Sequence, residues 1–340
     1  MRAAYLIEPG KIKIREVPEP TPGPGELVIR VECALTCGTD LKAYQRGHPL
    51  IPMPGPFGHQ YAGSLSSVGE GVSEFEADMP IWGVHSGPCG ECQYCRKTRY
   101  NLCPYLQQQM AFGAFGQFLR LPARVARHNV LPRPVGMPAE RAAFLEPVSC
   151  VVHALAQIDW RGVERVLLIG LGSMGLLFCQ LLPQVTKAKV VAIGRNAQRV
   201  AMARGGALEQ VIEVTSGGVN GTISDAGPFD CVIECTGRED GWRSAFEWVM
   251  PGGQVLFFGG LPGNTTFSID TYKLHYQELR LLGAFHFGPT DVRNAAQLLE
   301  QGSLRVADLI SGRLPLDQLD VGLQQMEAGS GIKYAIDPWA

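Results

Sequence analysis

One stretch near the middle of the chain limits the possible fold more than any other. An apolar run at 166–169 leads into Gly170, Gly172 and Gly175, and an apolar segment then continues to Leu182. This is the G-x-G-x-x-G pattern between a strand and a helix. The first glycine permits a tight turn, the second lets a pyrophosphate approach the backbone, and the third permits close helix–strand packing. The stretch therefore predicts a dinucleotide site at the N-terminus of that helix.

The region that begins at Arg165 alternates strand-like and helix-like segments. The predicted strands are residues 166–169, 190–193, 211–214, 230–234, 254–258 and 280–285. Two βαβαβ halves of this kind form a doubly wound parallel sheet, which binds ligands beyond the carboxyl ends of its strands. The fold class is therefore α/β, with a dinucleotide-binding domain predicted over 151–286.

The chain on either side of that region has a different pattern. Residues 1–150 contain short β-type runs in which apolar and polar side chains alternate. The other predicted elements are helices at 140–153, 291–301 and 316–328 and a closing strand at 333–336. We therefore predict a second domain, made of 1–150 and 287–340, into which the nucleotide domain is inserted.

Composition excludes several classes of protein. A formal net charge of −2 over 340 residues leaves no basic footprint for nucleic acid or an acidic membrane surface. The longest apolar stretch, 166–182, is broken by glycines and so does not predict a membrane span. No signal-peptide pattern opens the sequence, and without one the ten cysteines favour thiols or metal ligands over disulfides. A cytoplasmic location is the resulting expectation.

Four of the cysteines form a tight motif, C-x2-C-x2-C-x7-C. They are Cys89, Cys92, Cys95 and Cys103. Four thiolates in a loop rich in glycine, proline and polar residues, about 86–105, fit a closed tetrahedral zinc site. An iron–sulfur cluster is the first alternative, although the long last spacing fits bacterial ferredoxin patterns poorly. A disulfide loop is the second, and it conflicts with the expected compartment.

Three further residues are candidate metal ligands. A single cysteine or histidine is more often a core or loop residue than a metal ligand, and this holds for Cys37 and His59 when each is taken alone. Because the four-cysteine motif is sufficient for a structural site, this pair is available for another role. Glu146 lies within an apolar stretch, where a buried carboxylate needs a partner such as a metal. Its alternative is a surface glutamate beside Pro147, which would then mark a helix kink.

These motifs follow one another in a recognisable order. They are Cys37-Gly38-Thr39-Asp40, Gly58-His59, the four cysteines, Leu145-Glu146-Pro147 and the glycine turn. In this order the chain resembles the zinc-dependent medium-chain dehydrogenases/reductases of the alcohol dehydrogenase superfamily, nearest the sorbitol and threonine dehydrogenase branch. The resemblance implies a Rossmann domain inserted in a mainly β, GroES-like catalytic domain that carries a four-cysteine zinc lobe.

The resemblance also implies two zinc ions per chain and a role for each matched residue. Cys37 and His59 correspond to ligands of a catalytic zinc, and Glu146 to an acidic residue that is a ligand or a close neighbour. Thr39 corresponds to the hydroxyl that transfers the substrate proton. The structural zinc corresponds to Cys89, Cys92, Cys95 and Cys103. A zinc with three protein ligands keeps an open position, where it binds an alcohol and lowers the pKa of its hydroxyl.

Two positions depart from the family pattern. Gln60 stands where the family usually has the glutamate of G-H-E, which favours Glu146 as the third protein ligand. Lys42 stands where a histidine often ends the proton relay. His48 is close in sequence and could replace that histidine, or it could be an ordinary loop residue beside Pro49.

The end of the second predicted strand bears on the nicotinamide cofactor. NAD-specific sites place Asp or Glu there to bind the ribose hydroxyls, whereas this chain has Gly194 followed by Arg195 and Asn196. Arg195 and Arg199 could bind a 2′-phosphate, or they could be solvated helix residues. The sequence favours NADP(H) over NAD(H). The residues predicted to bind the cofactor are Gly170, Gly172, Ser173, Met174, Gly175, Gly194, Arg195, Asn196, Arg199, Thr236, Gly237, Gly259 and Gly260.

The leading hypothesis for function is a zinc-dependent oxidoreductase that transfers a hydride between a secondary alcohol and NAD(P). A polyol, a sugar alcohol or a related hydroxy compound is the expected substrate, and the homodimer or homotetramer is a family expectation. One alternative is an NADPH-dependent aldehyde or ketone reductase. Another is a non-catalytic sensor that binds zinc and a nucleotide, against which the intact set of Cys37, Thr39, His59 and Glu146 argues.

Overall fold

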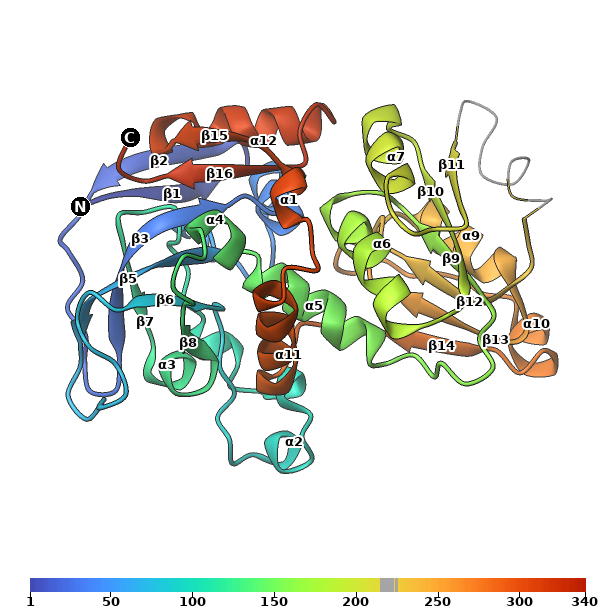
Figure 1. The fold of residues 1–340 in the computed structure, drawn as a ribbon, viewed down its shortest axis with the longest axis horizontal. Coiled ribbons are helices and arrows are strands. Elements are labelled where there is room, and N and C mark those ends of the chain that lie inside the picture. The colour runs from blue at the N-terminus through green and yellow to red at the C-terminus, as the bar shows by residue number, and fades with distance from the viewer. Residues whose placement is uncertain (215–222, 224–225) are drawn as a thin grey trace. The chain divides into compact units, whose positions relative to one another are not determined.

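The computed structural model describes residues 1–214, 223 and 226–340, and it divides into two compact units. Unit 1 consists of Met1–Cys150 and Phe287–Ala340, and unit 2 of Val151–His286. Figure 1 labels their helices and strands along the chain. Among the described residues, no helix is both long and apolar enough to cross a membrane.

Unit 2 is a parallel sheet covered by helices on both faces. Its strands are β9 (Arg165–Ile169), β10 (Lys189–Gly194), β11 (Gln210–Glu213), β12 (Phe229–Glu234), β13 (Val249–Phe257) and β14 (Arg280–Gly283). The order β11-β10-β9-β12-β13-β14, with every neighbouring pair parallel, is that of the doubly wound dinucleotide fold. The predicted α/β fold class is confirmed.

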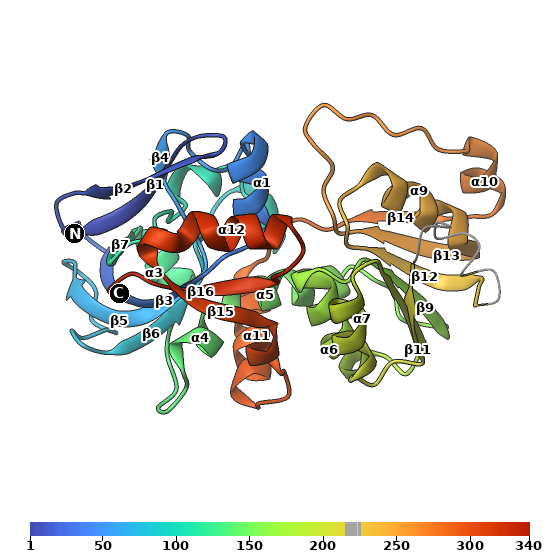
Figure 2. The same cartoon turned by 90° about the horizontal axis from the view of Figure 1, so that it is seen from above.

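Four helices of unit 2 are described between or beside those strands. They are α6 (Ser173–Val185), α7 (Ala197–Arg204), α9 (Glu239–Trp248) and α10 (Thr271–Tyr276). Figure 2 shows α6 and α7 on one face of the sheet and α9 on the other. The strands bury residues such as Leu167, Val191 and Val232 beneath them. Chain order reverses between β9 and β12, which is where ligands bind in open sheets of this kind.

Unit 1 is built around a mainly antiparallel sheet of order β15-β16-β3-β5-β6-β8, in which β15 and β16 are parallel and β7 pairs with β3. These strands are β3 (Leu27–Leu35), β5 (Tyr61–Val68), β6 (Pro80–Gly83), β7 (Phe118–Leu121), β8 (Val130–Pro132), β15 (Ile310–Pro315) and β16 (Lys333–Asp337). A small sheet of order β2-β1-β4 consists of β1 (Arg2–Glu8), β2 (Lys11–Glu16) and β4 (Gly55–Pro56). Apolar side chains from both sheets, including Leu6, Ile29 and Phe115, share one core.

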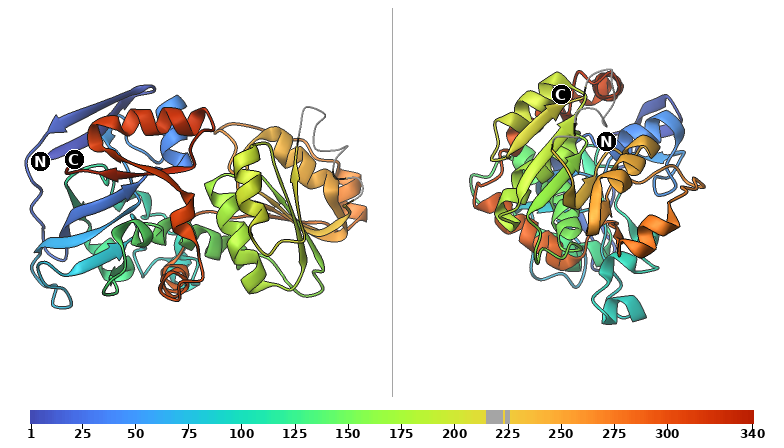
Figure 3. Two further views of the ribbon diagram at one scale, coloured as in Figure 1. Left: turned by 45° about the horizontal axis from the view of Figure 1, so that its top comes forward. Right: turned by 90° about the vertical axis from the view of Figure 1, so that its right-hand side faces the viewer.

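Short helices surround the sheets of unit 1. They are α1 (Gly38–Arg46), α2 (Gln93–Arg96), α3 (Ala123–Asn129), α4 (Ala139–Ala142), α5 (Leu145–Leu155), α11 (Pro289–Glu300) and α12 (Leu319–Glu327). The helix α5 continues past Cys150 into unit 2. Four 3₁₀ turns are also described: η1 (Tyr100–Leu102), η2 (Gln107–Gln109), η3 (Val306–Leu309) and η4 (Leu316–Gln318). The red helix α12 lies along strand β16 of the same unit (Figure 3).

The largest departure from the predicted elements is the helix expected over 140–153. It is two helices, α4 and α5, which are separated at Ala143 and Phe144. Pro147 explains the break, because a proline ring clashes with the carbonyl four residues earlier, here that of Ala143. In the first turn of α5 the same proline is tolerated. Pro147 therefore marks a helix start rather than a kink, and Glu146 lies in that first turn.

Candidate functional site

Antiparallel pairing brings three distant parts of the chain to one edge of the unit 1 sheet. Strand β3 ends at Leu35, whereas its neighbours β5 and β16 both begin beside that end. The backbone confirms the junction, because Leu35 N–H donates to the Gln60 carbonyl at 3.0 Å. Cys37 follows β3, His59 precedes β5, and Lys333 opens β16. The topology thus gathers residues that the sequence separates widely.

Cys37 and His59 lie together in this junction, and Asp40 supports both. Cys37 is 7% exposed, His59 4% and Asp40 0%. Cys37 is the N-cap of α1, and its backbone N–H donates to Asp40 Oδ2 at 2.9 Å. His59 Nδ1 lies 3.0 Å from Asp40 Oδ1. A carboxylate on one imidazole nitrogen, which leaves the other for a metal, is typical of metal-binding histidines.

Charges around Cys37 and His59 alter their acidity. Burial opposes ionisation of Cys37, but the Lys333 ammonium and the His59 imidazole together lower the pKa of the thiol below its usual value. Burial also opposes protonation of His59, but Asp40 and Cys37 raise its pKa well above the usual value. These shifts favour a Cys37 thiolate beside a His59 imidazolium. A divalent cation bound between them could replace the proton of the imidazolium.

Glu146 reaches the same junction from the first turn of α5. It is 6% exposed, and Gln60 Nε2 donates to its Oε2 at 2.6 Å. The Cys150 thiol, one turn along α5, donates to its Oε1 at 3.5 Å. Loss of hydration and the Glu146 carboxylate raise the pKa of Cys150 well above its usual value, so the thiol keeps its proton. Glu146 is therefore a buried acidic residue with two donors, not a surface residue.

A thiol, an imidazole and a buried carboxylate are together the donor set of catalytic zinc. Cys37 and His59 share a hydrogen bond, whereas Gln60 and Cys150 hold the Glu146 carboxylate. In the part of the chain that the structure describes, these three side chains do not bring their ligand atoms within 4.8 Å of one another. The donor types, their burial and the carboxylate on His59 nevertheless fit zinc.

Two residues of this junction were missed by the sequence reasoning. His85, 6% exposed, stacks edge-on against His59 with ring centroids 5.0 Å apart, and its Nδ1 lies 3.9 Å from Glu146 Oε1. Lys333 is fully buried. A lone histidine and a lone lysine in a strand carry no short-range pattern, so only the folded chain reveals them.

The structure locates the proton-relay candidates on and beside α1. Thr39 lies in the first turn of α1, and His48 lies in the loop that follows this helix. His48 Nδ1 accepts a hydrogen bond from the Leu50 N–H at 3.3 Å. Burial and the positive charge of Lys42 lower the pKa of His48, so its ring is neutral near pH 7.

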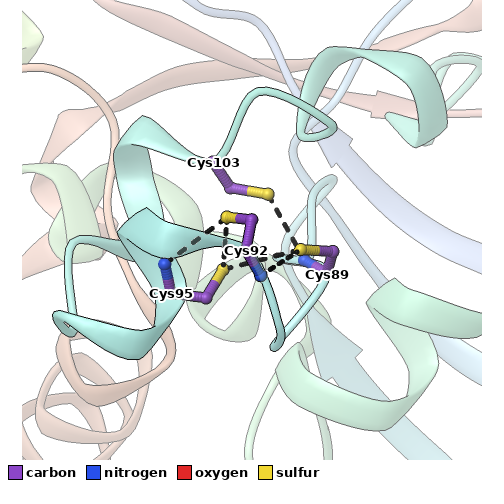
Figure 4. Close-up of side chains that lie close together, drawn as sticks. All are labelled: Cys89, Cys92, Cys95 and Cys103. Atoms are coloured by element: carbon purple, nitrogen blue, oxygen red, sulfur yellow. Dashed lines mark hydrogen bonds between the residues drawn. The ribbon is translucent and has the colours of Figure 1, made fainter.

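The four cysteines of the predicted lobe converge on one point (Figure 4). Their sulfurs all lie within 4.8 Å of one another, with Cys89–Cys95 at 3.8 Å and Cys92–Cys95 at 3.5 Å. Sulfurs at 2.3 Å from a tetrahedral zinc are about 3.8 Å apart, so the spacing fits zinc. Burial opposes ionisation, but the N–H groups of Glu91 and Cys92 lower the pKa of Cys89 to about 6.

Unit 2 contains a cavity of about 610 Å³ at the carboxyl ends of β9, β10 and β12. Of the residues predicted to bind a nucleotide, those that line it are Gly170, Gly172, Gly194, Arg195, Asn196, Arg199 and Thr236. The others lie outside its lining: Ser173, Met174, Gly175, Gly237, Gly259 and Gly260. The cavity opens at the switch point of the sheet, where the fold predicts a ligand.

The three glycines of the turn have the geometry that each predicted role requires. Gly170 has φ +101°, which only glycine adopts readily. A Cβ on Gly175 would lie 1.9 Å from the Gly170 carbonyl oxygen, so α6 and β9 pack in direct contact there. A Cβ on Gly172 would meet no atom within 4 Å. Gly172 thus leaves open space at the N-terminus of α6, which no side chain caps.

The cavity has more arginines than the sequence predicted. Arg238 and Arg243, on or just before α9, line it together with Arg195 and Arg199. Asp240 accepts from Arg195 at 2.7 Å and from Arg238 at 3.1 Å. Burial raises the pKa of Asp240, but these two arginines outweigh it and lower that pKa. Asp240 therefore holds two guanidinium groups at the mouth of the cavity.

Comparison with known proteins identifies the family. The family model described as "Alcohol dehydrogenase GroES-like domain" matches residues 23–132, and that described as "Zinc-binding dehydrogenase" matches residues 173–301. The chain is 30% identical over 341 residues to an L-threonine 3-dehydrogenase of Mesorhizobium japonicum, which covers 97% of this chain and 96% of that protein. The chain belongs to the zinc-dependent medium-chain dehydrogenase/reductase family. This dehydrogenase is an NAD(P)-dependent enzyme of the alcohol dehydrogenase type.

Other relatives resemble the dehydrogenase over almost its whole length. A D-xylulose reductase of Aspergillus clavatus is 26% identical and covers 96% of this chain and 93% of its own. A zinc-binding dehydrogenase of Sinorhizobium meliloti, solved with bound NADP, is 28% identical with a TM-score of 0.88. An alcohol dehydrogenase of Thermus sp. ATN1 is 26% identical with a TM-score of 0.85. Each of these two matches covers 99% of this chain and 99% of the chain in the solved structure.

Proposed function

We propose that this dehydrogenase oxidises a secondary alcohol, such as a polyol, a sugar alcohol or a related hydroxy compound, and reduces NADP⁺. The observation that carries the proposal is the junction in unit 1, which buries Cys37, His59 and Glu146. His85 contacts both His59 and Glu146 there. Relatives named for L-threonine 3-dehydrogenation and D-xylulose reduction support the substrate class, because each name describes chemistry at a secondary alcohol or its ketone.

NADP⁺ is supported by the charges that line the unit 2 cavity. Strand β10 ends at Gly194, so no carboxylate occupies the position that would repel a 2′-phosphate. Arg195 follows directly and Arg199 lies four positions further on, and the guanidinium group is the side chain best suited to bind a phosphate. The similarity to a dehydrogenase solved with NADP is consistent with this preference.

We assign two zinc ions to each chain. The structural ion would be bound by Cys89, Cys92, Cys95 and Cys103. The catalytic ion would be bound by Cys37, His59 and Glu146, which leaves one position of a tetrahedral ion for the substrate. When bound, zinc supplies a Lewis acid that lowers the pKa of the alcohol hydroxyl, and the nicotinamide accepts the hydride.

The residues of the chain then have separate tasks. Asp40 orients His59 through its Nδ1 and so fixes the ring for metal binding. The Thr39 hydroxyl accepts the substrate hydroxyl proton and passes its own proton outward. His48, neutral near pH 7, can receive that proton at the surface. The alcohol carbon loses a hydride and its oxygen loses a proton, which leaves a carbonyl, NADPH and one proton in solution.

Zinc content and activity on the purified enzyme test the proposal. We expect about two zinc ions per wild-type chain and one in Cys37→Ser, which also loses oxidation of secondary alcohols with NADP⁺. Cys103→Ser is the matched control and should lose the other ion. A wild-type chain that holds only one zinc, removed by Cys103→Ser, would overturn the catalytic site. If the enzyme reduces carbonyl compounds but oxidises no alcohol, the alternative function, an NADPH-dependent aldehyde or ketone reductase, would be favoured.

We also propose that the enzyme is a homodimer or homotetramer in the cytoplasm. Family membership supports assembly, and the formal net charge of −2 does not favour nucleic acid as a partner. Sedimentation equilibrium of the zinc-loaded protein tests the oligomeric state, and a monomer at micromolar concentration would contradict it.

A further inference from the structure

Among the residues that the structure describes, the buried cation Lys333 makes no direct hydrogen bond to a carboxylate. It is 0% exposed, and its Nζ donates to the Thr36 carbonyl at 2.7 Å and to Gln60 Oε1 at 2.6 Å. The backbone fixes its position, since Tyr334 N–H donates to Thr36 Oγ1 at 2.8 Å. Burying an ammonium group is costly unless its donors are satisfied. A lysine at this point therefore needs Gln60.

The Lys333 contact determines which way the Gln60 amide points. An ammonium only donates, so it must meet the oxygen of the amide and not its nitrogen. The nitrogen is thereby directed to the other side, where Nε2 donates to Glu146 Oε2 at 2.6 Å. Gln60 is also 0% exposed, so water does not compete for either end. A neutral amide thus links a buried cation to a buried carboxylate.

A glutamate at position 60 could not make this link. Its carboxylate would accept from Lys333 but would have no proton to donate to Glu146. It would also place a second negative charge where Nε2 now lies, 2.6 Å from Glu146 Oε2. Two carboxylates at that separation repel each other strongly in a buried site. Glutamine is therefore the residue type that lets Lys333 and Glu146 share one neighbour.

We propose that Gln60 and Lys333 are positioning residues that hold the Glu146 carboxylate in place to serve as the third protein ligand of the catalytic metal. The inference rests on the proposed function, because it assumes that Cys37, His59 and Glu146 bind zinc. It adds that the metal affinity of Glu146 depends on a lysine 187 positions later in the chain, which reaches it through Gln60.

Gln60→Met is the decisive variant, because it removes the donor to Glu146 and adds neither a charge nor a metal ligand in its place. The Lys333 ammonium then keeps the Thr36 carbonyl as its acceptor but loses Gln60 Oε1. We expect the melting temperature to fall, because a buried donor loses a partner. We expect zinc at the catalytic site to dissociate about 10- to 100-fold more readily in chelator competition, as is usual when a neighbour of a ligand is removed. The visible absorption of the Co²⁺-substituted protein should also change.

A second pair of variants separates positioning from folding. Lys333→Met leaves Gln60 without its donor and should weaken zinc binding by a similar factor. The double variant Gln60→Met/Lys333→Met removes both polar partners, which is less harmful to folding than leaving one unpaired. It should therefore recover thermal stability but not zinc affinity. Lys13→Met, at an exposed lysine of β2, is the control for loss of a positive charge.

The outcomes distinguish the inference from the function on which it rests. Wild-type zinc affinity and an unchanged Co²⁺ spectrum in Gln60→Met would overturn the positioning role and leave the zinc enzyme intact. Recovery of zinc affinity together with stability in the double variant would overturn it as well, since the pair would then be structural. A wild-type protein with no zinc outside the cysteine lobe would overturn the proposed function and this inference with it.

Discussion

We expect Gly175→Ala to destabilise unit 2. Gly172→Ala should leave the stability of unit 2 nearly unchanged but weaken its binding of NADPH. The two glycines lie three residues apart in the same turn, yet their surroundings are opposite. A Cβ on Gly175 would lie 1.9 Å from the Gly170 oxygen and 2.9 Å from its carbonyl carbon. Backbone atoms cannot rotate away as a side chain can, so α6 must move off β9.

The size of the effect follows from known costs of overpacking. Forcing extra atoms into a packed interior costs about 1–3 kcal/mol, and contact with backbone puts Gly175→Ala at about 2–3 kcal/mol. At roughly 2–4 °C per kcal/mol, the melting temperature should fall by about 4–12 °C. A Cβ on Gly172 would meet no atom within 4 Å, and the residue has φ −75°, which alanine adopts freely. Its destabilisation should stay below about 1 kcal/mol.

Differential scanning fluorimetry and NADPH fluorescence titration measure the two effects. Gly172→Ala should bind NADPH at least about tenfold more weakly, because its methyl group fills the space that a pyrophosphate would need. The reasoning fails if Gly175→Ala melts with the wild type. It also fails if Gly172→Ala binds NADPH normally, since the open space would then not be the phosphate site.

Three other expectations follow from contacts described above. Asp240→Asn should bind NADPH about two- to fivefold more tightly in fluorescence titration, because Asp240 no longer competes with a 2′-phosphate for Arg195; weaker binding would contradict this. The hydrogen bond from Arg161 lowers the pKa of Asp159. This ion pair therefore stabilises the fold fully above the usual aspartate pKa, and the stabilisation is lost as pH falls through the lowered pKa. Asp159→Asn should therefore lower the melting temperature more at pH 7 than at pH 2, and equal shifts at both would refute the pairing. Cys103→Ser should lower the melting temperature and make the lobe sensitive to protease, and resistance equal to that of the wild type would argue against a structural ion there.

The doubly wound sheet was predictable because its signals are local. Each strand is a short apolar run, and the turn at Gly170 carries its own glycine pattern. The sequence predicts the ends of helices and strands less accurately, as the helix expected over 140–153 demonstrates. From the sequence alone Pro147 is compatible with a helix kink, but a proline is equally compatible with the first turn of a helix that begins later.

Much of the candidate site could not be read from the sequence, because its contacts are not local. Gln60 and Lys333 are separated by 273 positions, and nothing near either residue indicates the other. His85 reads as an ordinary histidine until the sheet sets it against His59. Asp240 follows a different strand from Arg195, and only the folded chain shows that the start of α9 lines the same cavity as the end of β10.

The meeting of β3, β5 and β16 at one edge also has a consequence for biosynthesis. Cys37 and Gln60 leave the ribosome early, whereas Lys333 follows only after the whole of unit 2 has been made. Unit 2 is continuous in sequence, so it can fold while the sheet of unit 1 still lacks its strand β16. Lys333 can therefore reach the amide of Gln60 only after unit 2 has been synthesised. On the proposed function, the cysteine lobe would take up its metal during translation, and the junction would acquire its own after translation.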